Sequence, residues 1–275
     1  GRTEDISGFA NGGFEDIEKG FEYKDMCSGG RYSQSIVPIF NQQNRRSFDI
    51  YVPEKWANTN DKTACMSAKN FNTWYVEPSV QIVEDAYAGA YAVMLQSVGW
   101  DINGESIPDY LQVNGNYTQY SCNVPNIAHR ATGRLFLGNY SFNAATMNEH
   151  YGAGMQFGSR PSALNGFYKF VPSLSDTSDN GVALVEVLGL YNGMEIVIAR
   201  TELLLRPALT YTAFSAKLTY DYFGVKATRL RVMLASSSRY GSINEESANV
   251  PVSNDLMQAA AIGSTLWVDE LSLSY

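Results

Sequence analysis

The stretch VALVEVLGLYNGMEIVIA, from Val182 to Ala199, carries the clearest structural signal in the chain. Two runs rich in valine, leucine and isoleucine flank the dipeptide Asn192-Gly193. Asn-Gly between apolar runs is the strongest short signal for a tight turn that joins two antiparallel strands. The sequence therefore predicts a β-hairpin at this position.

Other segments of the last third repeat the signal of a half-buried strand. Apolar and polar residues alternate in TAFSAKLTYDYF (212–223), and the pattern returns in TRLRVMLASSS (228–238), so one face of each strand should lie on a core. The closing stretch GSTLWVDELSLSY (263–275) has the composition of a strand. Shorter strands are predicted over residues 86–100, 133–142, 148–157 and 164–173, and a short helix over residues 253–263.

Length and composition agree with one large β domain. The 275 residues are 45% hydrophobic and 17% charged, which is enough to bury a core and too apolar for disorder. Neither an internal repeat nor a linker divides the chain. We predict an all-β fold, an antiparallel double-sheet β-sandwich of jelly-roll type with long loops and little helix. Residues 9–275 form this domain, and residues 1–8 are a linker or an expression remnant.

The charge balance argues against several classes of partner. A net charge of −8 and a pI of about 4.8 disfavour nucleic acid and anionic membranes, because both attract basic surfaces. The sequence lacks the run of roughly 18 apolar residues that crosses a bilayer, and it lacks a signal peptide. Since Gly1 is consistent with an expression remnant, the missing leader says little about the natural protein.

Signals for metal binding and redox chemistry are weak. The three cysteines, Cys27, Cys65 and Cys122, are widely spaced and match neither a disulfide framework nor a zinc motif. We interpret them as free or buried thiols, with one disulfide plus a leftover thiol as the alternative. His129 and His150 have no second ligand at metal-binding spacing.

Catalytic motifs are equally scarce. The sequence has no nucleophile elbow, phosphate-binding loop or zinc-protease motif. Glycoside hydrolysis needs two carboxylates that face the scissile bond, and among 28 acidic residues some pair will fit by chance. Glu149 and Asp101 lie near predicted loops, so a glycoside hydrolase or lyase is the alternative to a non-catalytic protein.

Both ends of the chain resemble the first and last strands of jelly-roll carbohydrate-binding modules. GFANGGFED (8–16) contains the N-x-G-F-E phrase that opens such modules, and VDELSL (268–273) is similar to the phrase that closes them. More specifically, the chain resembles the PCMD family of carbohydrate-metabolism domains, found in polysaccharide-degrading anaerobic bacteria. The supporting phrases are PEKWANTND (53–61), GAYAVML (89–95), ATGRLFLG (131–138), SRPSALNGFYKFVP (159–172) and DNGVALVEV (179–187).

This resemblance implies an exported protein, either periplasmic or an outer-surface lipoprotein, with its leader upstream of the sequence. It also implies a role in glycan handling. We therefore predict a monomeric, non-catalytic domain that recognises oligo- or polysaccharide. A structural, adhesin-like surface protein is a third hypothesis, and it predicts a flat surface in place of a groove.

Several residues have the chemistry that a sugar requires. A sugar ring packs its apolar C–H face on a flat aromatic ring, while planar polar groups bind its hydroxyls. Trp74 and Trp100 stand among amide and carboxylate residues, Asp101 follows Trp100 directly, and Tyr110 is a candidate wall of the site. The alternative is that these rings belong to the core.

Arg160, Tyr168 and Glu149 complete the predicted ligand-binding set. Arg160 precedes a proline, and Tyr168 follows on the next predicted strand, so the guanidinium could present a rigid donor fork at the edge of a groove. The alternative for Arg160 is a buried salt bridge or a clamp on the backbone of a long loop.

The acidic residues at the two chain ends suggest a cation site. In the modules that the chain resembles, the first and last strands lie together and a carboxylate from each can hold a structural calcium. That resemblance assigns calcium ligation to Glu15, Asp16 and Asp269, and Ca²⁺ takes about six to eight oxygen ligands. The alternative is that Asp269 accepts backbone amides or pairs with an arginine. Glu270 is predicted to face solvent, opposite Asp269, through strand alternation.

Overall fold

The computed structural model of the chain describes residues 10–24, 47–67, 71–74, 78–99, 110–113, 116–119, 130–143, 146, 148–240 and 261–275. Nearly all regular structure in these ranges is β-strand, and α1 (Asn60–Thr63) is their single α-helix. No helix in the described ranges is long and apolar enough to cross a membrane. The all-β prediction is confirmed.

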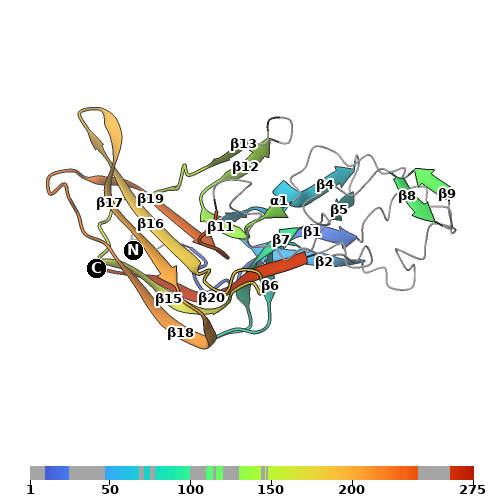
Figure 1. The fold of residues 1–275 in the computed structure, drawn as a ribbon. Coiled ribbons are helices and arrows are strands. Elements are labelled where there is room, and N and C mark those ends of the chain that lie inside the picture. The colour runs from blue at the N-terminus through green and yellow to red at the C-terminus, as the bar shows by residue number, and fades with distance from the viewer. Residues whose placement is uncertain are drawn as a thin grey trace.

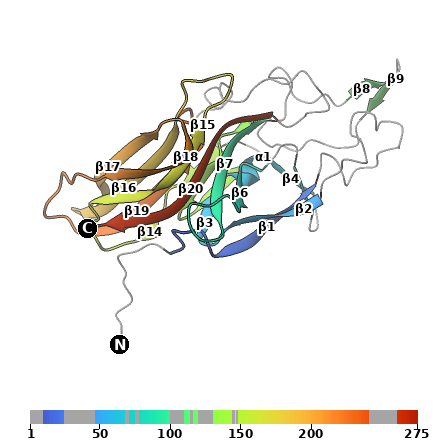
Figure 2. The same ribbon diagram turned by 90° about the horizontal axis from the view of Figure 1, so that it is seen from below.

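Two antiparallel six-stranded sheets form the body of a jelly-roll β-sandwich (Figures 1 and 2). The first sheet has the order β10-β7-β20-β15-β18, with β6 paired to β7. Its strands are β6 (Val80–Val83), β7 (Ala92–Gly99), β10 (Arg130–Ala131), β15 (Ala163–Val171), β18 (Ala208–Lys217) and β20 (Ala261–Ser274). The second sheet has the order β17-β16-β19-β11-β3, with β14 paired to β19. Its strands are β3 (Trp56–Asn58), β11 (Arg134–Leu137), β14 (Met155–Gln156), β16 (Gly181–Tyr191), β17 (Met194–Leu205) and β19 (Ala227–Ala235).

Four small two-stranded sheets accompany this body. They are β1 (Ile17–Lys24) with β2 (Ser47–Pro53), β4 (Ala64–Ser67) with β5 (Phe71–Trp74), β8 (Tyr110–Val113) with β9 (Asn116–Gln119), and β12 (Tyr140–Asn143) with β13 (Asn148–Tyr151). In Figure 1, the β12–β13 pair lies beside α1 and β11.

The hairpin predicted over residues 182–199 is confirmed as β16 and β17. Asn192 and Gly193 form its turn with φ angles of 51° and 77°. Two successive positive φ angles define the tight turn whose twist matches that of paired strands, and asparagine and glycine adopt them with little strain. The hairpin extends beyond the rest of the second sheet in Figure 1.

Several predicted boundaries are wrong. The strand expected over residues 86–100 begins only at Ala92, and those expected over residues 133–142 and 148–157 are each divided into two short strands. The strand expected over residues 212–223 ends at Lys217, and the remainder is a loop in which Tyr220 forms an isolated bridge with Ala199. The predicted helix was to stop at Gly263, yet β20 already begins at Ala261 and runs through this glycine. Residues 253–260 of that helix lie outside the described ranges.

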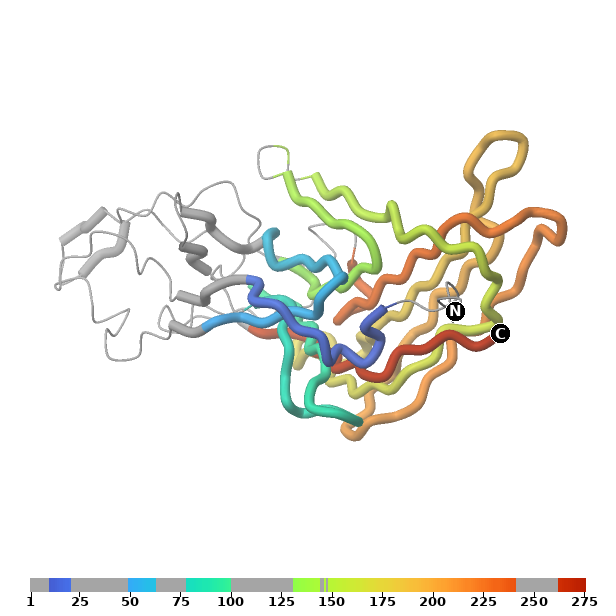
Figure 3. The backbone as a smooth tube through the Cα atoms, turned by 180° about the vertical axis from the view of Figure 1, so that it is seen from behind, coloured from blue at the N-terminus to red at the C-terminus, as the bar shows by residue number. Residues whose placement is uncertain are grey.

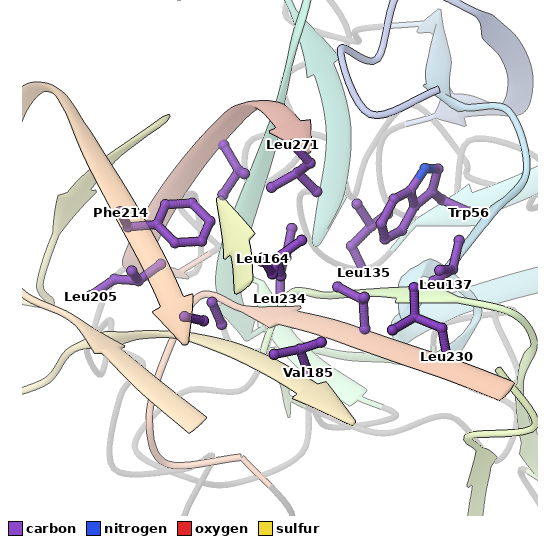
Figure 4. Packing of buried hydrophobic residues seen from close by; sticks show 14 of the residues in the cluster. Trp56, Leu135, Leu137, Leu164, Val185, Leu205, Phe214, Leu230, Leu234 and Leu271 are labelled. Carbon is purple, nitrogen blue, oxygen red and sulfur yellow. The ribbon is translucent and has the colours of Figure 1, made fainter. Parts of the chain in front are cut away.

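The two sheets share one hydrophobic core. The side chains of Leu164 and Leu266 from the first sheet, and of Leu135 and Leu234 from the second, are completely buried in it. Figure 4 shows residues of both sheets turned toward this common interior. Trp56 is 4% exposed and also belongs to the core.

A β-bulge interrupts β20 next to its two acidic residues. Asn165 of β15 pairs with Ser272 and Phe167 pairs with Asp269, so two residues of β20 stand opposite Gly166. Glu270, one of the two, has a φ of 51°. Its side chain is exposed, as predicted, but the cause is the bulge and not simple alternation.

We expect the shared core to dominate stability. Leu234→Ala should lower the free energy of unfolding by about 2–5 kcal/mol, because it leaves a cavity between the sheets. The control Leu174→Ala removes the same atoms from a side chain that is 93% exposed, and its effect should stay within about 0.5 kcal/mol. Urea unfolding of both variants checks this expectation, and equal losses would contradict a core at Leu234.

Candidate functional site

The sequence-predicted site residues do not gather in one place. Trp100 and Asp101 lie outside the described residues. Trp74 ends β5 and Tyr110 begins β8, and their side chains also lie outside the description. Three predicted ligand-binding residues, Glu149, Arg160 and Tyr168, therefore have described side chains, and each occupies a different environment.

Tyr168 requires a correction, since it belongs to the core. Its side chain is 8% exposed and makes an edge contact with the ring of Phe214 at 6.0 Å between centroids. Alternation along β15 turns Tyr168 inward, whereas Phe167 and Lys169 point to the outer face of the sheet. Burial raises the pKa of the Tyr168 hydroxyl. The ring is therefore closed to a ligand arriving from solvent.

Glu149 lies in a cluster of opposite charges between β11, β13 and α1. Its Oε1 atom accepts hydrogen bonds from Arg134 Nη2, from Lys62 Nζ at 3.0 Å and from the Tyr140 hydroxyl at 2.8 Å. Arg134 is completely buried, and its guanidinium lies 5.6 Å from the ring centre of Tyr151. Such a cluster fixes the β12–β13 pair against β11.

The charges around Glu149 decide its protonation state. Burial alone would raise the pKa of this carboxyl, but the charges and hydrogen bonds of Arg134 and Lys62 outweigh burial and lower the pKa to about 2. Glu149 therefore stays ionised at neutral pH. A permanently ionised carboxylate cannot donate the proton that a glycosidase acid delivers to its leaving group.

Arg160 acts as a clamp on the loop between β18 and β19. Its Nη2 donates to the Tyr222 carbonyl at 2.8 Å and its Nη1 to the Phe223 carbonyl at 3.0 Å. The guanidinium also stacks 4.2 Å above the ring of Tyr220, whose hydroxyl donates to the Pro161 carbonyl at 2.8 Å. This geometry matches the backbone-clamp alternative, because the fork of donors is occupied by the loop itself.

The loop that Arg160 holds forms one wall of an open cleft of about 760 Å³. The tip of the β16–β17 hairpin forms the opposite wall. The cleft is lined by Leu190, Tyr191, Asn192, Asp221, Tyr222, Phe223, Gly224, Val225, Lys226 and Thr228. A second hollow of about 530 Å³ adjoins the cleft and shares Leu190 and Thr228 with it.

Aromatic side chains stand exposed in this cleft. Phe223 is 90% exposed, Tyr191 49% and Tyr222 42%, and the rings of Tyr191 and Tyr222 lie 6.1 Å apart. A cluster of large exposed apolar side chains on a well-packed domain marks a binding surface. Sequence analysis missed these residues because it assigned Tyr222 and Phe223 to a strand. The available signal was the glycine after DYF, which favours a loop.

The two chain ends meet as the resemblance implied. The Leu271 amide donates to the Gly12 carbonyl at 2.8 Å, and Figure 3 shows the start of the described chain running alongside β20. Asp269 is completely buried there. Its Oδ2 accepts the amides of Tyr87 at 2.8 Å and Ala88 at 3.0 Å, and its Oδ1 accepts the amide of Glu270 at 2.7 Å.

Glu15 holds the same loop from its other end. Its Oε1 accepts the amides of Ala90 at 2.9 Å and Tyr91 at 3.2 Å. Asp16 is exposed, and its backbone is bonded to the side chain of Asn11. These contacts match the amide-accepting alternative for Asp269.

The donor set at the chain ends does not fit calcium well. Ca²⁺ needs about six to eight oxygen ligands, whereas both oxygens of Asp269 and one of Glu15 face amide hydrogens. Within the described ranges, no group of three or more acidic, histidine or cysteine side chains could hold a metal ion. Calcium at Glu15, Asp16 and Asp269 stays a prediction from the resemblance.

Comparison with known proteins finds only distant similarities of fold, at low sequence identity. No protein-family model and no curated protein matches the chain. A crystal structure from Bacteroides thetaiotaomicron, provisionally assigned as a glycoside hydrolase, is 14% identical, with a TM-score of 0.49 over 94% of this chain and 72% of that one. TmCBM61 in complex with β-1,4-galactotriose is 10% identical, with a TM-score of 0.30 over 80% and 88% of the two chains.

A family 11 carbohydrate-binding module from Clostridium thermocellum, in complex with a mixed-linked tetrasaccharide, is 9% identical. Its TM-score is 0.32 over 80% of this chain and 89% of that one. At such scores these likenesses carry no information on what this chain binds. Its own fold and surface define an all-β jelly-roll protein with an aromatic cleft at one end.

The Glu149 cluster should make stability depend on pH. The pKa of the Glu149 carboxyl is about 2 in the folded protein, below the ordinary 4.5. The stabilising effect of the ionised carboxylate is therefore present above pH 4.5 and is lost as the pH falls toward 2. Glu149→Gln removes the charge that faces Arg134 and Lys62, and should lower the free energy of unfolding by about 3 kcal/mol at pH 7.

Urea unfolding at pH 7 and pH 3 measures this effect. The difference between wild type and Glu149→Gln should shrink at pH 3. Glu195→Gln is the control, because Glu195 pairs with Arg229 at the surface and such a pair contributes less than about 1 kcal/mol. A difference that is unchanged at pH 3 would contradict the depressed pKa.

Chelation of calcium should leave the melting temperature unchanged, because amide hydrogens already satisfy Asp269 and Glu15. Differential scanning calorimetry with EDTA, and then with added Ca²⁺ or Mg²⁺, measures this directly. If EDTA lowers the melting temperature and only Ca²⁺ restores it, the result would support the calcium site implied by the resemblance and contradict the expectation drawn from the amide contacts.

Proposed function

We propose that this chain is a non-catalytic glycan-recognition domain that binds an oligo- or polysaccharide in the cleft between the β16–β17 tip and the β18–β19 loop. The observation that carries the proposal is the set of exposed rings of Tyr191, Tyr222 and Phe223 in an open cleft. An exposed ring loses little conformational freedom when a ligand covers it and offers a large apolar face.

The polar residues of the cleft supply the second half of sugar recognition. Asn192 at the hairpin turn, Asp221 and Lys226 all line it. An amide, a carboxylate and an ammonium group together can accept and donate hydrogen bonds to several ring hydroxyls. Because a second hollow adjoins the cleft at Leu190 and Thr228, this surface suits several sugar units in a row better than a monosaccharide.

The chemistry of the cleft favours binding over hydrolysis. Among the described residues that line the cleft, Asp221 is the only carboxylate, and Glu195 in the second hollow is paired with Arg229 at 3.0 Å. Hydrolysis by the common mechanisms uses two carboxyl groups, one on each side of the scissile bond. Of the two catalytic acids considered from the sequence, Glu149 has a described side chain. It lies outside the cleft, where it is ionised and accepts hydrogen bonds from three donors.

A groove also distinguishes this proposal from the adhesin-like hypothesis, which predicts a flat surface. Export and a lipid anchor are part of the proposal on the strength of the NGGFED and VDELSL resemblance. Fractionation of cells that make the natural protein would test them, and a soluble cytoplasmic pool would contradict export. Light scattering would test the predicted monomer.

Removal of the exposed ring should weaken glycan binding. Phe223→Ala should reduce affinity for a bound polysaccharide about tenfold or more, because burial of an aromatic ring contributes roughly 1.5–3 kcal/mol. Affinity electrophoresis in gels that contain soluble β-glucan, xylan or galactan measures the effect. Leu174→Ala, which changes an exposed apolar residue outside the cleft, is the control.

Arg160→Lys tests whether the clamp shapes the cleft. Lysine keeps the charge but cannot donate to two carbonyls while it stacks on Tyr220, so the loop should loosen and affinity should fall. Retained affinity in both Phe223→Ala and Arg160→Lys would contradict the assignment of glycan binding to this cleft.

A further inference from the structure

We propose that the loop Glu84–Tyr91 completes a preorganised aromatic platform on the outer face of the first sheet, and that this platform is a second glycan-contact surface. The proposal shares its ligand class with the proposed function, but it rests on other residues. The platform consists of Tyr87, Phe167, Tyr211 and Trp267, with Lys169 between the last two rings.

The loop is fixed along its whole length. Asp269 accepts the amides of Tyr87 and Ala88, and Glu15 accepts those of Ala90 and Tyr91. Earlier in the loop, the side chain of Asp85 forms an ion pair with Lys169. The backbone carbonyl of Asp85 accepts a hydrogen bond from the Tyr211 hydroxyl. The loop is therefore anchored by the first segment, by the last strand and by two further strands of the sheet, β15 and β18.

Glycine at position 89 makes the Glu15 anchor feasible. Gly89 has a φ of 69°, and a Cβ atom there would lie 2.1 Å from Glu15 Oε1. Any side chain at this position would therefore expel the carboxylate from the loop. The Glu15 anchor therefore depends on a residue without a side chain at position 89.

The buried Asp269 carboxylate is a costly way to hold a loop. Burial raises the pKa of Asp269, although the amide hydrogen bonds oppose this, and the nearby Glu15 charge raises it further. A buried charge is retained when its partners matter for position. Those partners are the backbone of the segment that carries Tyr87.

Tyr87 is the part of the platform that reaches solvent. One face of its ring stacks on Phe167, with centroids 3.6 Å apart and an interplanar angle of 11°, and Tyr211 meets it edge-on at 5.9 Å. The side chain is nevertheless 49% exposed. A ring that is covered on one face and open on the other is a rigid flat surface.

Charge balance selects the class of ligand. Lys169 is only 14% exposed, lies 4.9 Å from the ring centres of both Tyr211 and Trp267, and is neutralised by Asp85. Within the ring cluster the charge of Lys169 is therefore balanced by Asp85, and the exposed carboxylate of Glu84 at the start of the loop disfavours an acidic ligand. The flat, immobile and neutral ring face of the platform suits the apolar C–H face of an uncharged sugar in a polysaccharide chain.

Tyr87→Ala tests the platform directly. Its affinity for neutral β-glucan, xylan or galactan in affinity gels should fall about tenfold, and Tyr87→Trp should restore binding. Tyr51→Ala is the matched control, because Tyr51 is similarly exposed, at 43%, and belongs to neither set of ring residues. Binding by Tyr87→Ala that equals wild type would overturn the platform.

Gly89→Ala and Asp269→Asn test the anchors as positioning residues. Both should speed amide hydrogen exchange at residues 87–91 and weaken binding while Tyr87 itself is retained. If exchange speeds up but affinity does not change, the anchors serve stability alone and the inference is overturned. Should Asp269→Asn fail to fold, Gly89→Ala still decides the question.

Comparison with Phe223→Ala separates the two surfaces. Loss of binding in Tyr87→Ala but not in Phe223→Ala supports the platform and contradicts the cleft. The reverse result supports the cleft and overturns the platform. Failure of the wild-type protein to bind any of the three polysaccharides overturns both.

Discussion

Glu270 adopts a left-handed backbone conformation in the middle of β20, and the extra residue there stands opposite Gly166 of β15. This bulge resets the alternation of the strand, so Val268 and Leu271 both face the core although they are three residues apart. It also frees the Leu271 amide for Gly12 and turns Asp269 toward the loop that crosses the sheet. The closing strand, the first segment and that loop are all positioned by this one irregularity.

Buried charge is used in two places for the same purpose. Asp269 binds backbone amides, and Glu149 binds Arg134 and Lys62. In both cases an acid links segments that are far apart in the chain, and it holds a peripheral element against a sheet. Arg160 does so with the opposite charge, since its guanidinium binds carbonyls of the β18–β19 loop. Aromatic residues exposed near two of these anchors are thereby kept rigid, which lowers the entropy lost on binding.

Local patterns were sufficient wherever neighbours in sequence decide the conformation. Asn192-Gly193 predicted the turn, and the alternation around Leu230, Val232 and Leu234 predicted the strand. The prediction of one buried face holds only for the first half of this strand, because Met233 and Ala235 are buried on the other face. The same reasoning failed for Tyr222 and Phe223, because the alternating pattern continues after Lys217 while Arg160 binds the carbonyls of that segment. It failed for Tyr168 because aromatic content alone does not state which face of β15 meets the core.

The sequence by itself determined the all-β class, the main hairpin and most central strands, since these follow from short-range patterns. The meeting of the two chain ends was implied only by the resemblance to carbohydrate-binding modules. Only the tertiary structure decided which acids hold amides, which arginine clamps a loop and which rings reach solvent. Those outcomes depend on partners such as Tyr87 and Asp269, which are 182 residues apart, and no local pattern encodes a distance of that kind. Burial, charge pairing and register must be satisfied together, and only the packed sheets satisfy them.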